Sequence, residues 1–182
     1  MLQRITCGPM FAGKTTSLLR DFNRHGGIVI RSNYDIRYSN TAVVTHNKEE
    51  VPATSVSSAI ELLRAIEEHD HVFIDELHFF VEPMFHGDLL HIMNTSPQKF
   101  FCYGLDFDWK GDLFPISQAC INTAVEVERL EGVCSCCGQP SKMTYMHALK
   151  NKESNLDSGH NEVYEPRCLL CWEEGLKIRS VA

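Results

Sequence analysis

Short apolar runs alternate with amphipathic segments along the first 131 residues. The apolar runs contain few polar positions and predict strands that are covered on both faces of a sheet. The amphipathic segments place leucine, isoleucine or phenylalanine at helical spacing and predict helices. An alternation of strands and helices is typical of an α/β domain with a mainly parallel sheet. We expect strands at Leu2–Cys7, Gly27–Arg31, His71–Asp75, Phe100–Leu105 and Ala124–Leu130, and helices at Lys14–Arg24, Ala59–Glu68 and roughly Pro83–Met93.

Two stretches interrupt this alternation. Residues 32–52 are polar and long, which in a compact domain indicates a functional loop or a hairpin. After Glu131 the chain is rich in cysteine, glycine and short polar segments, with little periodicity. Such a segment cannot bury a core unaided, so we expect a metal-stapled subdomain there. The predicted organisation is an α/β domain over residues 1–131 and a cysteine-rich subdomain over residues 132–182.

A glycine-rich motif, GPMFAGKTT, lies between the first predicted strand and the first predicted helix. Its spacing fits the phosphate-binding loop, in which backbone N–H groups surround phosphate oxygens, a lysine adds charge and a hydroxyl holds Mg²⁺. The alternative is a glycine-containing turn that happens to precede a helix, but the order strand, loop, helix favours a nucleoside triphosphate site. The predicted phosphate-binding residues are Gly8, Pro9, Met10, Phe11, Ala12, Gly13, Lys14, Thr15 and Thr16.

Composition narrows the possible functions. The chain has 182 residues, of which 43% are hydrophobic and 23% are charged, as expected for one globular core. Its net charge is -7, and no block of Lys or Arg stands out, which disfavours a nucleic-acid partner. No apolar run is long enough for a membrane span, and the N-terminus does not have the pattern of a secretory signal. We therefore expect a cytoplasmic protein with no membrane partner.

Four of the eight cysteines have the spacing of metal ligands. Two C-x-x-C pairs, one at Cys134 and Cys137 and one at Cys168 and Cys171, match a tetrahedral structural Zn²⁺ site. Redox or buried cysteines are the alternative, and Cys136 competes as a ligand. The remaining cysteines lie in apolar runs and are predicted to be small core residues: Cys7, Cys102 and Cys120.

An acidic pair ends the predicted strand in HVFIDELHFF. Asp75 and Glu76 are therefore expected at the carboxyl edge of the sheet, on the side of the phosphate loop. One carboxylate there can hold the Mg²⁺ that Thr15 also holds, and the second is free for proton transfer. A solvated turn is the alternative, which the phosphate loop in the same chain disfavours.

Five motifs, in this order, resemble type II thymidine kinases, the cytosolic zinc-containing class. They are GPMFAGKT, YDIRYS with a following TH, DELHFF, YGLDFDWKGDLF, and the two C-x-x-C pairs with Tyr164 four residues before Cys168. The resemblance covers essentially the whole chain, and CYGLDFDWKGDLF is closest to the bacterial and phage-like branch. It implies a P-loop NTPase-like fold with a small zinc-ribbon-like lasso subdomain. It also implies phosphorylation of thymidine by ATP, with deoxyuridine as a second substrate, in a homotetramer.

The resemblance also implies roles for individual residues. Glu76 stands where the family has its catalytic base, Lys14 would stabilise the transferring phosphoryl group, and Thr15 and Asp75 would support Mg²⁺. Arg37 matches the arginine near the phosphates. The residues that match the nucleoside site are Met10, Phe79, Leu105, Trp109, Phe114, Thr144 near the thymine 5-methyl group, and Gly159, His160 and Tyr164 of the lasso.

Three positions depart from the family pattern. His78 stands where glutamine is usual, Arg31 replaces a lysine, and Gly159-His160 replaces a common glycine pair. Because histidine titrates near neutral pH, the positioning of Mg²⁺ or water by His78 is expected to differ.

Two other functions compete with the kinase. A P-loop ATPase with a zinc ribbon acting on DNA would have a basic face, which the acidic composition disfavours. A non-catalytic nucleotide sensor would have no use for a base at Glu76. Phosphorylation of thymidine is therefore the leading hypothesis.

Overall fold

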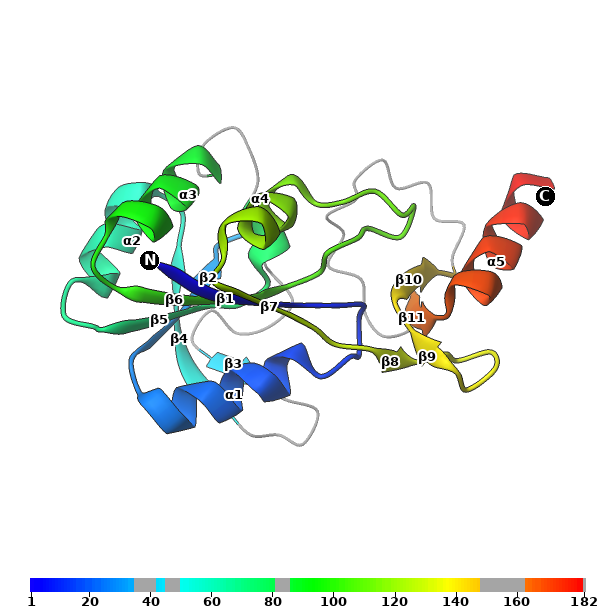
Figure 1. Cartoon of the computed structure of the whole chain (residues 1–182), viewed down its shortest axis with the longest axis horizontal. Helices are drawn as coiled ribbons and strands as arrows, with labels where there is room; N and C mark the ends of the chain where they lie inside the picture. Colours follow the sequence, from blue (N-terminus) through cyan, green and yellow to red (C-terminus); the bar gives the residue numbers. More distant parts are fainter. Residues whose placement is uncertain (35–41, 45–49, 81–85, 148–162, 182) are drawn as a thin grey trace.

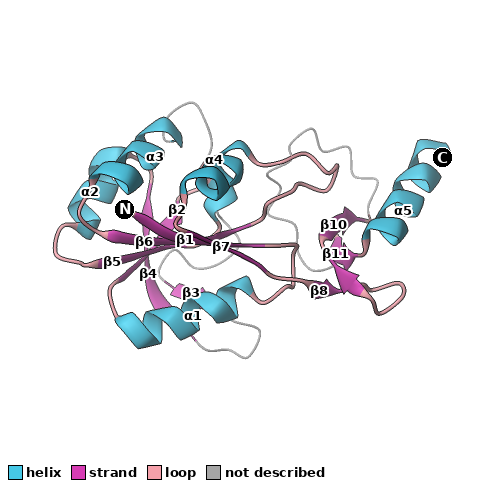
Figure 2. Ribbon diagram, in the orientation of Figure 1, coloured by secondary structure: helices cyan, strands magenta, loops and turns pink. Residues whose placement is uncertain are grey.

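The computed structural model describes residues 1–34, 42–44, 50–80, 86–147 and 163–181. Its centre is a seven-stranded sheet with helices on both faces (Figures 1 and 2). The strand order is β3-β4-β2-β5-β6-β1-β7, and only the edge strand β3 runs antiparallel to its neighbour. The strands are β1 (Leu2–Cys7), β2 (Ile28–Ser32), β3 (Ala42–Val44), β4 (Glu50–Val56), β5 (His71–Ile74), β6 (Lys99–Gly104) and β7 (Glu126–Arg129). The predicted α/β fold with a mainly parallel sheet is confirmed.

Helix α1 covers one face of the sheet, and three helices cover the other (Figure 1). Alternate residues of each strand supply the two apolar layers, because successive side chains of a strand point to opposite faces. In β5, Val72 and Ile74 join the layer beneath α2, α3 and α4, whereas Phe73 joins the layer beneath α1. The helices are α1 (Lys14–His25), α2 (Ala59–Ile66), α3 (His86–Thr95) and α4 (Pro115–Thr123).

Local signals explain most of these elements. Helix α2 begins after Ser58, whose hydroxyl accepts the N–H of Glu61, as the capping pattern predicts. Polar contacts fix α1 on the sheet, because Asp21 accepts a hydrogen bond from Tyr103 at 2.7 Å and pairs with Arg4. The three cysteines predicted for the core, Cys7, Cys102 and Cys120, are fully buried. In the described part of the chain no helix has the length and apolar character needed to cross a bilayer.

The C-terminal part is built differently from the sheet domain. It contains two small antiparallel sheets, β8–β9 and β10–β11, and the helix α5 packs on the β10–β11 sheet (Figure 1). They lie at the end of the molecule where the loop after β1 is found, because Gly132 packs near Pro9 and Met10. A domain division between residues 131 and 132 stays a prediction. The elements are β8 (Gly132–Val133), β9 (Pro140–Ser141), β10 (Met143–Met146), β11 (Tyr164–Arg167) and α5 (Leu169–Val181).

The structure contains several elements that the sequence analysis did not predict, among them the short strands β8, β9, β10 and β11. Helices α4 and α5 were not predicted, and the polar stretch after β2 contains β3 and leads into β4. Because β3 and β4 are antiparallel neighbours, the hairpin alternative suits this stretch better than a loop without strands.

Candidate functional site

The glycine motif forms the turn between β1 and α1. Gly13 has a φ of 88° and precedes the first residue of α1, a backbone conformation that glycine adopts without strain. At Gly8, a Cβ atom would lie 2.3 Å from the carbonyl oxygen of Leu130, so only glycine fits there. Phe11 also has a positive φ, 63°, although it is not glycine. Strained backbone of this kind is concentrated at ligand sites.

Lys14 lies across this turn. Its Nζ donates to the carbonyl oxygens of Gly8 at 3.1 Å and Pro9 at 2.7 Å. The N-terminus of α1 follows directly, with Thr15 and Thr16 in the first turn and no acidic residue there. Because a helix N-terminus presents unpaired N–H groups and a positive dipole end, the turn suits an anion such as phosphate.

The acidic pair follows β5, one strand removed from β1, because β6 lies between them. Asp75 is buried, and its N–H bonds to the carbonyl oxygen of Ile30. Glu76 has φ 47° and ψ 50°, in the left-handed region, and begins the short 3₁₀ helix η1 (Leu77–Phe79). A non-glycine residue held in this conformation costs about 1–3 kcal/mol, which the surrounding structure must offset.

His78 joins the acidic pair to the loop after β6. Its Nδ1 lies 3.6 Å from Glu76 Oε2 and accepts the N–H of Leu105 at 3.3 Å. Since Nδ1 accepts this hydrogen bond from Leu105, the neutral ring carries its hydrogen on Nε2, and Glu76 Oε2 is then a neighbour of Nδ1 without a hydrogen bond to it. The ring is buried between Phe79 and Phe114, with centroid separations of 4.5 and 5.1 Å. The structure thus brings together three predicted site residues, Glu76, Phe79 and Phe114, around a histidine.

Asp106 is a candidate site residue that the sequence analysis missed. It lies two residues after the end of β6, is buried, and is near enough to Cys7 to affect the pKa of its thiol. Burial raises the pKa of Asp106, while backbone N–H groups and the charges of Lys14 and Arg129 act in the opposite direction. Burial, with a contribution from Asp106, raises the pKa of Cys7 to about 11. The signal available in the sequence was a carboxylate directly after a buried apolar run.

Residues 106–114 form a compact loop that carries the predicted nucleoside residue Trp109. Phe107 pairs with Leu113 as an antiparallel bridge, and the carboxylate of Asp108 accepts the N–H groups of Lys110 and Asp112. The loop ends at Phe114, whose N–H bonds to Asp106 O at 3.0 Å. These contacts fix the loop locally before any ligand binds.

Strand β10 brings the C-terminal subdomain to the phosphate loop. The hydroxyl oxygen of Thr144, which is buried, accepts the N–H of Met10 at 3.1 Å. On the same hairpin, Met146 pairs with the buried Tyr164, and His147 N–H bonds to Val163 O at 2.7 Å. His147 and Val163, the last described residue before and the first after positions 148–162, therefore lie side by side. Arg37, Gly159 and His160 lie outside the described residues.

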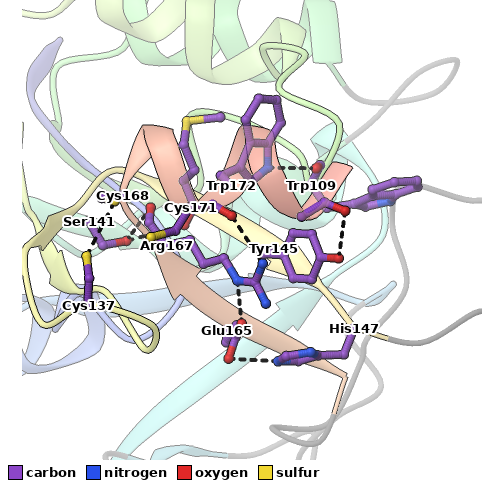
Figure 3. A network of polar contacts seen from close by, with 12 residues as sticks. Trp109, Cys137, Ser141, Tyr145, His147, Glu165, Arg167, Cys168, Cys171 and Trp172 are labelled. Atoms are coloured by element: carbon purple, nitrogen blue, oxygen red, sulfur yellow. Dashed lines mark hydrogen bonds and ion pairs between the residues drawn. The ribbon is translucent and has the colours of Figure 1, made fainter. Parts of the chain in front are cut away.

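The four predicted metal ligands converge at the other end of this hairpin. The sulfur atoms of Cys134, Cys137, Cys168 and Cys171 all lie within 4.8 Å of one another, and those of Cys137 and Cys168 are 3.7 Å apart (Figure 3). A tetrahedral Zn²⁺ with bonds of about 2.3 Å separates its sulfur ligands by about 3.8 Å. The donor set and its spacing therefore fit zinc. Cys136 is exposed and is not part of the cluster.

The electrostatics of the cluster also favour a cation. Burial would raise the pKa of Cys134, but N–H groups of Cys168, Cys137 and Cys136 outweigh it and lower that pKa to about 6. The pKa of Cys171 is raised mainly by the neighbouring sulfur of Cys168 and, to a smaller extent, by that of Cys137. Four thiolates cannot share this space without a compensating charge, and a divalent metal supplies it.

The comparison with known families agrees with this geometry. The sequence model of the family described as "Thymidine kinase" matches residues 2–172. The match includes the glycine turn, the acidic pair, the loop after β6 and all four clustered cysteines, and the cysteine cluster is consistent with the zinc-containing type II class. The chain therefore belongs to the thymidine kinase family and is an ATP-dependent kinase.

Proposed function

We propose that the chain transfers the γ-phosphate of ATP to the 5′-hydroxyl of thymidine, and also of deoxyuridine, at a site between the phosphate loop and the C-terminal subdomain. The observation that carries this proposal is the hydrogen bond from Met10 N–H to Thr144. It joins the phosphate loop to a strand that resembles the thymine-binding strand of the family. Phosphoryl donor and nucleoside acceptor must meet within one site for direct transfer.

The proposed chemistry assigns each charged group one task. The nucleoside 5′-oxygen attacks the γ-phosphorus, its proton passes to Glu76, and the bond to the β-phosphate oxygen breaks to release ADP. The ammonium group of Lys14 would exchange its hydrogen bonds to the carbonyl groups of Gly8 and Pro9 for hydrogen bonds to the phosphoryl oxygens, where it would stabilise their negative charge. Mg²⁺, when bound with ATP, neutralises phosphate charge, and Thr15 and Asp75 are the residues that would hold it.

Two further features support these roles. Glu76 has a left-handed backbone conformation at the start of η1, and its carboxylate lies 3.6 Å from His78 Nδ1. The N–H groups of Gly13 to Thr16 lie at the start of α1, where an anion is stabilised by the helix dipole. We also propose Arg37 as a phosphate ligand.

For the nucleoside, apolar side chains from three segments would enclose the base and sugar. They are Met10, Phe79, Leu105, Trp109 and Phe114. The hydroxyl of Thr144 is already bonded to Met10, which leaves its γ-methyl group to pack on the thymine 5-methyl group. Main-chain groups of the lasso, at Gly159, His160 and Tyr164, would bind the pyrimidine edge.

We further propose that Cys134, Cys137, Cys168 and Cys171 hold a structural Zn²⁺, and that the protein is a cytoplasmic homotetramer. The thiol cluster fits the metal, and free thiols are typical of the reducing cytoplasm. The acidic net charge of -7 disfavours the alternative of a DNA-dependent ATPase.

A nucleoside panel tests the proposed function. Purified protein is incubated with ATP, Mg²⁺ and each of thymidine, deoxyuridine, deoxycytidine and deoxyadenosine, and monophosphate formation is followed by chromatography. We expect product from thymidine and deoxyuridine only, and no stimulation of ATP hydrolysis by DNA. DNA-stimulated hydrolysis without any nucleoside product would overturn the proposal and support the ATPase.

A further inference from the structure

The chain has two tryptophans, and they meet although 63 residues separate them. The indole Nε1–H of Trp172 donates to the main-chain oxygen of Trp109 at 3.1 Å (Figure 3). The Trp172 ring also lies against Gly111, where an added Cβ atom would be 2.9 Å from Trp172 Cη2 and 3.2 Å from Cζ2. Trp172 therefore holds the 106–114 loop through a hydrogen bond and through close packing.

Trp172 is itself fixed by the cysteine cluster. It follows Cys171 directly in the first turn of α5, and its N–H bonds to Cys168 O at 3.0 Å. The position of its ring therefore depends on the backbone that presents two of the four clustered sulfur atoms.

The β10–β11 hairpin holds the same helix from the other side. The guanidinium of Arg167 donates to Cys171 O at 3.2 Å and stacks on Tyr145 at 3.6 Å (Figure 3). The hydroxyl of Tyr145 donates to Gly175 O at 3.2 Å. At Gly175 an added Cβ atom would lie 2.4 Å from Arg167 Nη1, so the helix approaches the hairpin as closely as glycine permits. Helix α5 thus has little freedom to move while the cluster is intact.

We propose that Trp172 is a positioning residue that makes the 106–114 loop, and with it Trp109, depend on the metal state of the cysteine cluster. The inference rests on the proposed function at one point, because it takes Trp109 to be one of the residues that enclose the nucleoside. Without Trp172, the loop keeps its internal contacts at Asp108 but loses the hydrogen bond at Trp109 and the ring that packs on Gly111. Thymidine binding then weakens, because binding must also fix the position of the loop as a whole relative to the nucleoside.

The first test is kinetic. Trp172→Phe keeps most of the ring and loses the N–H, and Trp172→Ala loses both. We expect the thymidine KM to rise about 3-fold for Trp172→Phe and about 10-fold for Trp172→Ala, with the KM for ATP within about 2-fold of the wild type. Leu170→Ala is the matched control, because Leu170 is 72% exposed in the same helical turn. Equal changes for both substrates, or an unchanged thymidine KM in zinc-loaded Trp172→Ala, would overturn the proposal.

The second test does not depend on catalysis. Hydrogen–deuterium exchange of peptides covering residues 106–114 is compared with and without zinc removal by a chelator. Zinc removal is expected to increase exchange in the wild type and in Leu170→Ala, but to add little in Trp172→Ala, where exchange is already high. An equal response to zinc removal in all three proteins would show that Trp172 does not connect the two sites. If the nucleoside panel fails while this pattern holds, the proposed substrate is wrong and the coupling remains.

Discussion

The side chain of Thr144 has two groups with different proposed roles. Its hydroxyl oxygen accepts the N–H of Met10, and its methyl group is proposed to pack on thymine; substitution can remove either group alone. Thr144→Val keeps the branched shape and loses the hydroxyl, whereas Thr144→Ser keeps the hydroxyl and loses the methyl group. In the wild type Thr144 is 3% exposed, and the bond measures 3.1 Å. Thr144→Val therefore leaves the N–H of Met10 facing an apolar group with little access to water.

The cost can be worked from this burial. Leaving a buried donor unsatisfied costs about 1–3 kcal/mol, and the lower part of that range applies because the contact is only partly buried. A change of about 1–2 kcal/mol corresponds to about 5- to 30-fold in an equilibrium constant. Because Met10 belongs to the phosphate loop, we expect this loss mainly in ATP affinity.

The assay is a pair of titrations for each variant: ATP varied at saturating thymidine, then thymidine varied at saturating ATP. Thr144→Val should raise the KM for ATP about 5- to 30-fold. Thr144→Ser should leave that KM near the wild-type value and reduce the preference for thymidine over deoxyuridine, since the packed methyl group is lost. A folded Thr144→Val protein with wild-type ATP kinetics would refute the idea that this bond holds the loop.

Three further substitutions test the remaining roles. Glu76→Gln should lower kcat by about 10²- to 10⁴-fold and leave ATP binding, measured by calorimetry, largely intact; near-normal turnover would exclude Glu76 as the base. Lys14→Ala should lower kcat and raise the KM for ATP, since the ammonium acts on phosphate oxygens in both states; unchanged ATP kinetics would mean that the turn binds no phosphate. Cys171→Ser should reduce the zinc content below one per chain and raise the thymidine KM more than the ATP KM; full zinc content with ordinary thymidine kinetics would contradict the metal site.

The sheet could be predicted from the sequence because its physical cause is local. The central strands β5 and β6 are covered on both faces, so most of their residues must be apolar, and the sequence HVFI shows this directly. Helices α1 and α2 carry an apolar stripe that faces the sheet, with Leu18 and Leu62 fully buried. These patterns need no knowledge of distant partners.

Helix α5 could not be predicted because its stability has another origin. Leu169, Leu170 and Ile178 are more than half exposed, so no apolar stripe marks the helix in the sequence. It is held by the cysteine cluster at its start and by the contact of Gly175 with Tyr145 and Arg167. A glycine inside a helix costs about 1 kcal/mol in propensity, and here it permits the close approach. The propensity cost can be read from the sequence, whereas the compensating contact with Tyr145 and Arg167 cannot.

In the candidate site, too, features with a local cause could be predicted, and features that depend on distant contacts could not. The glycine turn, the acidic pair and the cysteine spacing are recognisable because each is a short motif with its own chemistry. The contacts of Met10 with Thr144 and of Trp109 with Trp172 join residues 134 and 63 positions apart. Their geometry follows from how the subdomain docks on the sheet domain, which no local pattern specifies.

The way the subdomain docks explains how a cysteine cluster outside the phosphate loop can affect the candidate site. Two elements tied to the cluster reach the candidate site from different sides: β10 contacts Met10 through Thr144, and α5 contacts Trp109 through Trp172. A subdomain with so small an apolar core cannot hold both contacts by burial alone, because ordering each residue costs about 1–2 kcal/mol of backbone entropy. Metal–thiolate bonds can supply that free energy at one point. Apart from the Thr144 contact, the phosphate loop is built on β1 and α1, whose packing belongs to the main core. Loss of the metal should therefore impair the nucleoside side of the site before it impairs the fold of the phosphate loop.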